Sequence, residues 1–419
     1  MKKIVALLLA VAMLLCFAGC GENAGDETLG MSASPLDSIE IKADYKIADD
    51  FKIGFICLHD ENSTYDLNFL NAAETAQKAL GLKDEQVIIK TNVPEGNECY
   101  VAAADLVDQG CKIVFANSFG HEDFMIQAAK EFPNVQFCHA TGTKAHTEGL
   151  DNYHNAFASI FQGRYLAGIA AGMKLNEMIE AGDIKAEEAK MGYVGAYTYA
   201  EVISGYTSFF LGAKSVCPSV TMEVQFTGSW YDATEEKNAA EALIANKCVL
   251  ISQHADSMGA PGACEAAGVP NVSYNGSTYD SCPTTFIVSS RIDWAPYFNY
   301  IIGCVSKGEA ISADWCGGIE EGSVVLTGIN QDVAAEGTVD AIKKAVADLK
   351  DGKVSVFDTK NFTVGDKALE TYTADVDTDA AFTPETEAVE NGIFTESTKR
   401  SAPYFDVRID GIKLLNEKY

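Results

Sequence analysis

The sequence predicts an α/β protein of two lobes, each built on a parallel β-sheet with helices between its strands. Short runs of β-branched and aromatic residues alternate with helical stretches over most of the chain, which is the pattern of parallel strands joined by crossover helices. Eight of these runs form two series of four, so we expect two sheets. About 375 residues follow the N-terminal segments, more than one hydrophobic core normally holds.

The first nineteen residues have the three parts of a secretory signal. Lys2 and Lys3 form a basic start, an apolar run covers 4–17, and the small residues Ala18 and Gly19 precede Cys20. The apolar run is about 14 residues long and a bilayer span needs roughly 20, so we expect residues 1–19 to be cleaved. Small residues before a cysteine are typical of bacterial lipoproteins, which makes Cys20 the predicted lipid attachment site. An ordinary signal peptide with a chance cysteine is the alternative.

Residues 20–44 are expected to form a flexible tether between this lipid and the folded part. They are rich in Gly, Ser, Asp and Glu and show no apolar period. The folded part is predicted to begin near residue 45. No later stretch has the apolar length that a membrane span needs.

Charge and cysteine content exclude several classes of function. The net charge of −29 repels nucleic acid and anionic lipid surfaces, so we expect no nucleic-acid partner. Of the twelve cysteines, those left after Cys16 and Cys20 form no CxxC pair, and several lie inside apolar runs. We therefore predict no metal site and no cofactor. Disulfides and free buried thiols both remain open.

The expected elements follow one another in chain order. The first series of strands is 52–58, 87–92, 113–116 and 135–140, with helices at 66–80, 98–109 and 122–131. The second series is 191–196, 222–226, 249–252 and 272–274, with helices at 159–181, 201–215 and 234–246. Each helix has about the length that a crossover requires.

Later elements indicate that the chain passes between the lobes more than once. Strands at 285–289 and 323–326 and a helix at 294–307 are more than the second sheet needs, and a tail from 353 with strand-like VSVF and GIKLL should pack as an appendage. The expected N-terminal lobe is therefore 45–153 with 286–318 and 353–419. The expected C-terminal lobe is 154–285 with 319–352.

A ligand of such a protein would lie beyond the carboxyl ends of the strands, where loops meet helix starts. The loops there offer aromatic rings, amides and carboxylates but hardly any Lys or Arg. This composition favours a flat, neutral or cationic ligand with several donors, such as a nucleoside. The candidate ligand-binding residues are Asp60, Tyr65, Asp66, Ser118, Phe119, Gly120, Asn155, Tyr199, Trp230, His254, Asp256 and Asn275.

Seven segments, in this order, resemble the basic membrane protein family of substrate-binding lipoproteins. The resemblance covers nearly all of the chain after the tether. Several members of that family bind purine nucleosides or nucleobases for ABC importers. The segments are GFICLHDENSTYD, IVFANSFGHEDF, YHNAFASIFQGRYLAGIAAG, GYVGAYTYAEVISGYTSFFLGAKSV, TGSWYDATEEKNAAEALI, LISQHAD and RSAPYFDVRIDGI.

The resemblance implies a type I periplasmic-binding fold, with two Rossmann-like lobes joined by three crossover strands and closing over the ligand. It also implies permease and ATPase partners and an extracytoplasmic, lipid-anchored location. Tyr65 matches the aromatic residue that stacks on the base in relatives, many of which carry Phe or Trp there, and Asp66 stands where relatives often have Asn.

Further cleft residues follow from the same resemblance. Ser118, Phe119 and Gly120 match the family's SFG segment. Gln253, His254 and Asp256 match the QHAD segment, and Asp256 is our hypothesis for the residue that binds the two ribose hydroxyls. Trp230 and Asn275 occupy places that relatives direct to the cleft.

Three of the candidate residues have a structural role as an alternative, and the whole chain has alternative functions. Tyr65 can cover the top of its lobe, Phe119 can fill core, and Trp230 can close the gap between lobes. A sugar or amino acid is an alternative ligand, and a receptor that reports to a sensor is an alternative role. The enzymatic alternative is a nucleoside hydrolase using His254 with Asp256, and Ser252 or Ser257 nearby, although the chain has no GxSxG motif.

Overall fold

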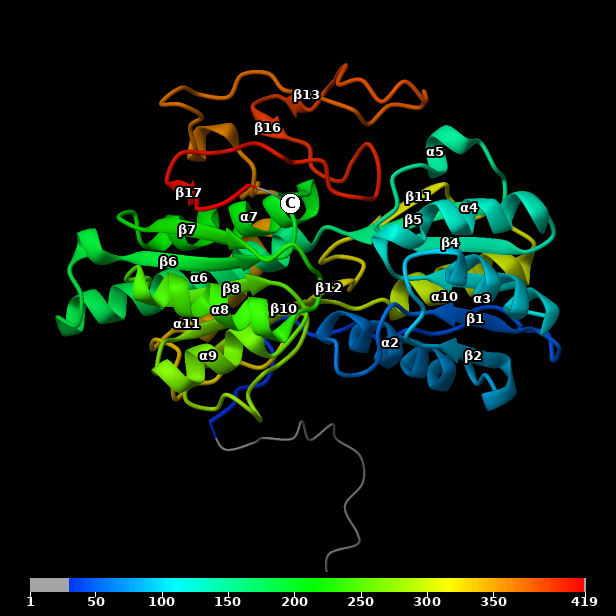
Figure 1. The fold of residues 1–419 in the computed structure, drawn as a ribbon, viewed down its shortest axis with the longest axis horizontal. Helices are drawn as coiled ribbons and strands as arrows, with labels where there is room; N and C mark the ends of the chain where they lie inside the picture. The colour runs from blue at the N-terminus through cyan, green and yellow to red at the C-terminus, as the bar shows by residue number, and fades with distance from the viewer. Residues whose placement is uncertain (1–29, 418–419) are drawn as a thin grey trace, which may run out of the picture.

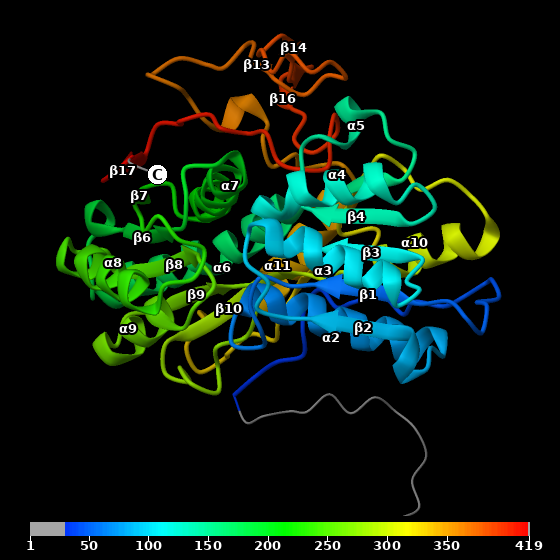
Figure 2. The ribbon, with the colours of Figure 1, turned by 45° about the vertical axis from the view of Figure 1, so that its right-hand side comes forward.

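The computed structural model describes residues 30–417. The expected signal peptide and the lipid attachment site at Cys20 therefore lie outside the described residues. Two α/β lobes lie side by side, and a C-terminal tail lies over both of them (Figures 1 and 2). Within residues 30–417, no helix combines the length and apolar character that crossing a bilayer requires.

The N-terminal lobe contains a six-stranded sheet in which every neighbouring pair is parallel, in the order β11-β5-β4-β3-β1-β2. Helices cover both faces, which is why the IGFI and IVFA strands β1 and β3 are buried throughout. The strands are β1 (Ile53–Ile56), β2 (Val87–Lys90), β3 (Ile113–Ala116), β4 (Gln136–Ala140), β5 (Tyr153–Ala158) and β11 (Asp314–Gly317). The helices are α2 (Thr64–Leu80), α3 (Asn97–Asp108), α4 (Glu122–Glu131), α5 (Ala145–Glu148) and α10 (Ala295–Lys307), with single turns η1 (Asp84–Gln86) and η2 (Phe119–His121).

The C-terminal lobe contains a seven-stranded sheet in the order β12-β10-β9-β8-β6-β7-β17. Its pairs are parallel except for the antiparallel pair of β10 with β12. The strands are β6 (Lys190–Gly195), β7 (Thr221–Phe226), β8 (Leu250–His254), β9 (Asn271–Tyr274), β10 (Phe286–Ile292), β12 (Val324–Leu326) and β17 (Ile412–Leu414). The helices are α6 (Ile160–Ala181), α7 (Ala200–Val216), α8 (Ala233–Ala245), α9 (Gly259–Ala267) and α11 (Thr338–Lys350), with a turn η3 (Ala186–Glu188).

The chain passes between the two sheets three times, as the family resemblance implied. The crossings lie at 158–160, at 292–295 and at 317–324. They are hydrogen-bonded to one another, because the Ser159 N–H donates to the Gly317 carbonyl and the Asp293 N–H donates to the Ser323 carbonyl, each over 2.8 Å. Bending of these three adjacent segments is the natural way for such lobes to open and close.

The sheet topology corrects the expected lobe boundaries. Strand β5, at 153–158, belongs to the N-terminal sheet, although we expected that lobe to end at 153. Strand β10 was expected in the N-terminal lobe but pairs with β9, and β17 near the chain end pairs with β7, so both lie in the C-terminal sheet. A strand's own residues show that it will be buried in a sheet, but its neighbours decide which sheet.

The expected tether also begins to pack much earlier than residue 45. The Ser32 N–H donates to the Ile329 carbonyl over 2.8 Å, and the Leu326 N–H donates to the Leu36 carbonyl over 2.9 Å. Leu36 and Ile41 are both buried. Residues 31–41 therefore form a strap along the C-terminal lobe. The strap is held by backbone hydrogen bonds, which the side-chain composition of the segment does not predict.

Two further details complete the fold. The VSVF run of the tail forms no strand, and its last two residues, Val356 and Phe357, are instead buried in an irregular segment before η4 (Thr359–Asn361). Every cysteine among residues 30–417 is a free thiol, and all of them except Cys316 are buried. Before β17, the described part of the tail also contains the short strands β13 (Thr373–Ala374), β14 (Thr386–Glu387), β15 (Val389–Glu390) and β16 (Ile393–Phe394).

Candidate ligand-binding cleft

A cavity with about 20 Å³ of free volume lies between the lobes. Its walls come from the carboxyl ends of β1, β3 and β4 in one lobe and of β7, β8 and β9 in the other, where parallel sheets place their sites. The lining residues are Leu58, His59, Tyr65, Asp66, Ser118, Phe119 and Thr141 from the N-terminal lobe, with Glu201, Trp230, His254, Asp256 and Tyr274 from the C-terminal lobe.

The lobes contact each other directly around this cavity, so the structure shows a closed form. The backbone N–H and the hydroxyl of Thr64, at the start of α2, both donate to the carbonyl of Asp256, over 3.0 and 3.2 Å. At the rim the ring of Phe119 packs on Tyr199 of the other lobe, with 5.2 Å between ring centroids.

Tyr65 is fixed from within its own lobe. Its hydroxyl donates to the Asn117 carbonyl over 2.7 Å, and its ring packs edge to face on Phe69 at 4.9 Å. Burial, together with Glu201 and Asp66, raises the pKa of Tyr65 well above its usual value, so the phenol stays neutral. Because the hydroxyl is already bonded, what Tyr65 offers the cavity is the face and edge of an aromatic ring.

Asp66 is held as a charged carboxylate in the first turn of α2. It accepts hydrogen bonds from the Ser63 hydroxyl and the Asn117 amide, each over 2.7 Å, and from the His59 N–H over 3.1 Å. Burial alone would raise the pKa of Asp66, but the bonds from His59, Asn117 and Ser63 outweigh it and hold the pKa below its usual value. The positive end of the helix dipole also favours this charge.

Asp256, on the opposite wall, has far less support. The Asn275 amide donates to its carboxyl over 3.1 Å. Burial raises the pKa of Asp256 well above the usual value, and the nearby Asp66, Glu236 and Glu201 carboxyls add to the rise. Burial in the closed cleft therefore favours the protonated form of Asp256, and hydrogen-bond donors on a ligand would favour its charged form.

His254 and Glu201 form a pair beside Asp256. Nε2 of His254 lies 3.4 Å from Oε1 of Glu201, and the imidazole packs on the Tyr274 ring at 4.4 Å. Burial lowers the pKa of His254, and Glu201 opposes this only in part, so the imidazole is neutral.

The serines of the hydrolase alternative point elsewhere. The Ser252 hydroxyl donates to the Val272 carbonyl and accepts from Arg164, each over 2.6 Å, while the Ser257 hydroxyl accepts from the Gly259 N–H over 3.0 Å. His254 pairs with Glu201 rather than Asp256. This arrangement differs from the serine, histidine and aspartate relay that the hydrolase alternative requires.

Seven of the twelve predicted site residues line the cavity: Tyr65, Asp66, Ser118, Phe119, Trp230, His254 and Asp256. Two of the others stand just behind or above it, because Asn275 bonds to Asp256 and Tyr199 packs on Phe119 at the rim.

The structure places the remaining three outside the cavity. The Gly120 N–H donates to the Glu95 carboxylate over 2.7 Å, which helps to fix the loop that carries Phe119. Asp60 is half-buried and accepts hydrogen bonds from the side chains of Asn62 and Asn92. Asn155 is buried within β5, where it accepts from the Ala145 N–H over 2.7 Å and supports the sheet instead of the cleft.

Sequence reasoning missed Leu58, His59, Thr141, Glu201 and Tyr274. His59 and Thr141 were within loops already expected at the site, and Tyr274 is the last residue of an expected strand. Glu201, in the first turn of α7, carried the same signal as Asp66 in α2, a carboxylate at a helix start after a strand.

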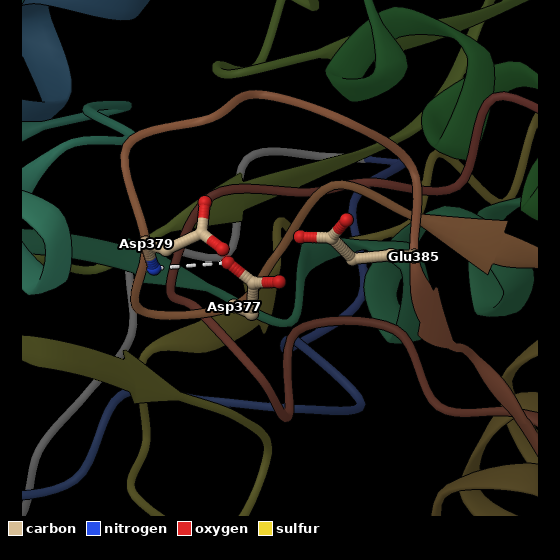
Figure 3. Close-up of side chains that lie close together, drawn as sticks. All are labelled: Asp377, Asp379 and Glu385. Atoms are coloured by element: carbon tan, nitrogen blue, oxygen red, sulfur yellow. Dashed lines mark hydrogen bonds between the residues drawn. The ribbon is translucent and has the colours of Figure 1, made fainter.

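A separate group of carboxylates lies on the tail, away from this cleft. Asp377, Asp379 and Glu385 place one oxygen each within 4.8 Å of the others, and the Asp379 N–H donates to Asp377 over 3.0 Å (Figure 3). Exposed carboxylates gather in this way without an ion, so we assign no metal to them.

Comparison with known proteins identifies the family. The family model for PnrA-like substrate-binding proteins of ABC transporters, named Bmp, matches residues 58–360. The chain belongs to this family. Proteins of this kind work on the extracytoplasmic side of the membrane, with a small-molecule ligand and with permease and ATPase subunits.

Three similar proteins are named for different ligands. A purine-binding protein of Brucella abortus is 31% identical over 66% of this chain and 74% of its own. A putative glucose-binding protein of Haloferax volcanii is 30% identical over 54% of each chain. A nucleoside-binding protein, BmpA, of Lactococcus lactis is 23% identical over 62% of this chain and 66% of its own.

A solved structure supports the fold alone. The ABC transporter solute-binding protein of Conexibacter woesei superposes with a TM-score of 0.60 at 20% identity, covering 73% of this chain and 98% of its own. Its two-lobed fold is the one described above.

Proposed function

We propose that this substrate-binding protein captures a purine nucleoside or a purine base between its closing lobes. The observation that carries the proposal is the lining of the cleft, which offers the carboxyls of Asp66, Glu201 and Asp256 beside aromatic rings and, among the described residues, no Lys or Arg. Such walls suit a flat ligand that brings hydrogen-bond donors. The names of the Brucella and Lactococcus relatives support the same ligand class.

In this proposal, each wall of the cleft supplies both aromatic rings for stacking and a carboxyl group for hydrogen bonding. The rings of Tyr65, Phe119 and Trp230 provide apolar faces for the base. Asp66 is a permanent acceptor for N–H groups, and Asp256 accepts ribose hydroxyls.

We also propose that the mature protein is anchored to the membrane through a lipid on Cys20 and delivers its ligand to a permease. The small residues before Cys20 support this. Replacement Cys20→Ser should move the protein from the membrane fraction to the soluble fraction after cell lysis. Retention of Cys20→Ser in the membrane fraction would remove the lipid anchor from the proposal.

A sugar is the second candidate ligand, favoured by the name of the Haloferax relative. Aromatic rings and carboxylates also bind sugars, whose hydroxyls are donors. Ligand binding by itself would not separate an importer from a receptor that reports to a sensor. Loss of nucleoside uptake on deletion of the gene would favour the importer.

The test is a thermal-shift screen of the protein lacking residues 1–20 against purine nucleosides, purine bases, the matching 5′-monophosphates, sugars and amino acids. A ligand that binds only the folded state adds about 2.7 kcal/mol of stability at a hundredfold excess over Kd. We expect shifts with nucleosides or bases and none with monophosphates, because a phosphate would face carboxylates without a cation.

The same samples test the enzymatic alternative by chromatography. Release of free base from a bound nucleoside would replace the binding proposal with a hydrolase. Shifts with sugars or amino acids alone would keep the transport role and overturn the purine ligand.

A further inference from the structure

The C-terminal tail, residues 353–411, joins the two lobes outside the three crossings. It leaves the C-terminal lobe after α11 and returns to it at β17, and between these points it lies over α7 and reaches toward β11 and α5 (Figures 1 and 2). The family model matches up to residue 360, and the segment RSAPYFDVRIDGI further along the tail is one of those that resemble the family.

The tail is firmly held on the C-terminal lobe. Strand β17 pairs with β7, and Asn416 bonds to both backbone groups of Phe226, over 2.8 and 2.9 Å. Its own small core stacks Phe357 on Phe405 at 4.2 Å and packs Phe357 against Phe161 of α6 at 5.2 Å. The tail therefore moves with this lobe.

The tail reaches the N-terminal lobe at strand β11. The N–H and the hydroxyl of Ser401 donate to one carboxylate oxygen of Asp314, over 2.8 and 2.7 Å, and Nδ1 of His146 in α5 lies 3.1 Å from the other oxygen. Ser401 is 1% exposed. Burial would raise the pKa of Asp314, but the bonds from His146 and Ser401 outweigh it and keep the carboxylate charged.

We propose that Ser401 and Asp314 form a latch that holds the two lobes in the closed orientation and so sets the ligand affinity of the cleft. Because Ser401 moves with the C-terminal lobe and Asp314 with the N-terminal lobe, rotation about the crossings displaces one from the other. Strand β11 leads directly into the crossing at 317–324, so the latch acts next to the pivot.

The direction of the effect follows from a two-state equilibrium. If the latch favours the closed state, its loss lowers the closed fraction of the ligand-free protein, and the apparent affinity falls by the same fraction. The fall in affinity rests on the proposed binding function, whereas the fall in the closed fraction does not.

The test compares the ligand-free protein and Ser401→Ala by small-angle X-ray scattering. We expect a larger radius of gyration for Ser401→Ala and, with inosine as the probe, about tenfold faster dissociation, the effect of one hydrogen bond to a charged group. Asp314→Asn should act in the same direction, because the amide accepts more weakly from Ser401 and His146.

Thr363→Ala is the matched control. The Thr363 hydroxyl donates to the Asp410 carboxylate over 2.6 Å, the same chemistry with both partners inside the tail, so the radius of gyration should not change. An unchanged radius for folded Ser401→Ala, or an equal change in Thr363→Ala, would reduce the contact to a structural brace and overturn the latch. Absence of inosine binding by the unmodified protein would count against the proposed ligand, and the scattering result would still decide on the latch.

Discussion

Asp66 and Asp256, on opposite walls of the cleft, differ in the number of hydrogen bonds that their carboxyl groups accept. Asp66 has donors at both oxygens and a helix start behind it, whereas Asp256 has Asn275 alone as an amide donor. The first is a charged acceptor before any ligand arrives. The second needs either a proton or the donors of a ligand, because an unpaired buried carboxylate is costly.

The first residue-scale prediction concerns Tyr65. Tyr65→Ala should weaken nucleoside binding about tenfold to a hundredfold, because base stacking on an aromatic ring contributes roughly 1–3 kcal/mol. Titration calorimetry measures the affinity. Tyr65→Phe is the control, since it keeps the ring and loses only the bond to Asn117. Equal affinities for Tyr65→Ala and the unmodified protein would remove Tyr65 from the binding site.

The second concerns Asp256. Asp256→Asn should raise the melting temperature of the ligand-free protein at pH 8, because the pKa of Asp256 is raised in the fold and stability present at low pH is lost as pH rises. The same change should weaken nucleoside binding at least tenfold, since a charged acceptor is lost. Asp49→Asn, at an exposed position outside the cavity, should change neither quantity. A stability gain without a loss of affinity would mean that Asp256 does not contact the ligand.

At the scale of elements, the closest packing is between α6 and α7. A Cβ on Gly168 would lie 2.0 Å from the Phe209 carbonyl oxygen, and one on Gly212 would lie 2.0 Å from the Tyr165 carbonyl oxygen. The two helices therefore touch through their backbones. This contact fixes the position of α7 relative to α6.

Gly168→Ala should therefore destabilise the protein by about 1–3 kcal/mol, the usual cost of overpacking. Gly262→Ala in α9 is the matched control, because no atom lies within 4 Å of its added Cβ, and alanine there should stabilise by up to about 1 kcal/mol. Urea unfolding of both variants measures the difference. Similar effects of the two substitutions would contradict the backbone contact.

Sequence patterns predicted most elements of the two sheets but missed β5, β11, α9 and α11. Strand β5 reads YHNAFA, whose His154 and Asn155 suggest a loop, yet both are buried with hydrogen-bond partners. Helix α9 contains two glycines and a proline. In each case tertiary contacts outweigh a weak local preference.

At the scale of the whole molecule, buried ionisable groups set the pH dependence of stability. Burial raises the pKa of Glu236 to about 7 and that of Glu396, in the tail, to about 8. Burial lowers the pKa of His121, His139 and His154 to about 4. Below pH 6.5 these histidines and glutamates have opposite effects on how stability changes with pH. Compared with the folded protein, the unfolded chain binds more protons at the histidines and fewer at the glutamates.

Between pH 6.5 and 8 only the carboxyls act, so the melting temperature should fall as pH rises. The folded-state pKa of Glu396 is raised, and its stabilising contribution, complete below about pH 4.5, is lost as pH rises through 8. Glu396→Gln should flatten this fall, whereas Glu370→Gln, on the exposed part of the tail, should leave it unchanged. Scanning calorimetry across this range is the measurement, and an equal slope in all three proteins would contradict the assignment to Glu396.

The sequence by itself determined the fold class, the two sheets and the loops from which a ligand site could be built, while the three crossings were implied by the family resemblance. The sheets and loops can be predicted from local signals, because hydrophobic periodicity and the position of a strand's end depend on residues that are neighbours in the chain. It also singled out Tyr65, Asp66 and Asp256 as polar and aromatic residues that follow strands.

Only the tertiary structure decided which of these residues meet and in what state. Asn155 and Asp60 carry the same sequence signal as Asp256, but the first lies in a strand and the second bonds to Asn62 and Asn92 outside the cavity. Tertiary contacts also placed β10 and β17 in one sheet and brought Ser401 onto Asp314. These outcomes depend on contacts between residues far apart in the chain, and the burial that shifts the pKa of a carboxyl exists only once both lobes are folded and closed.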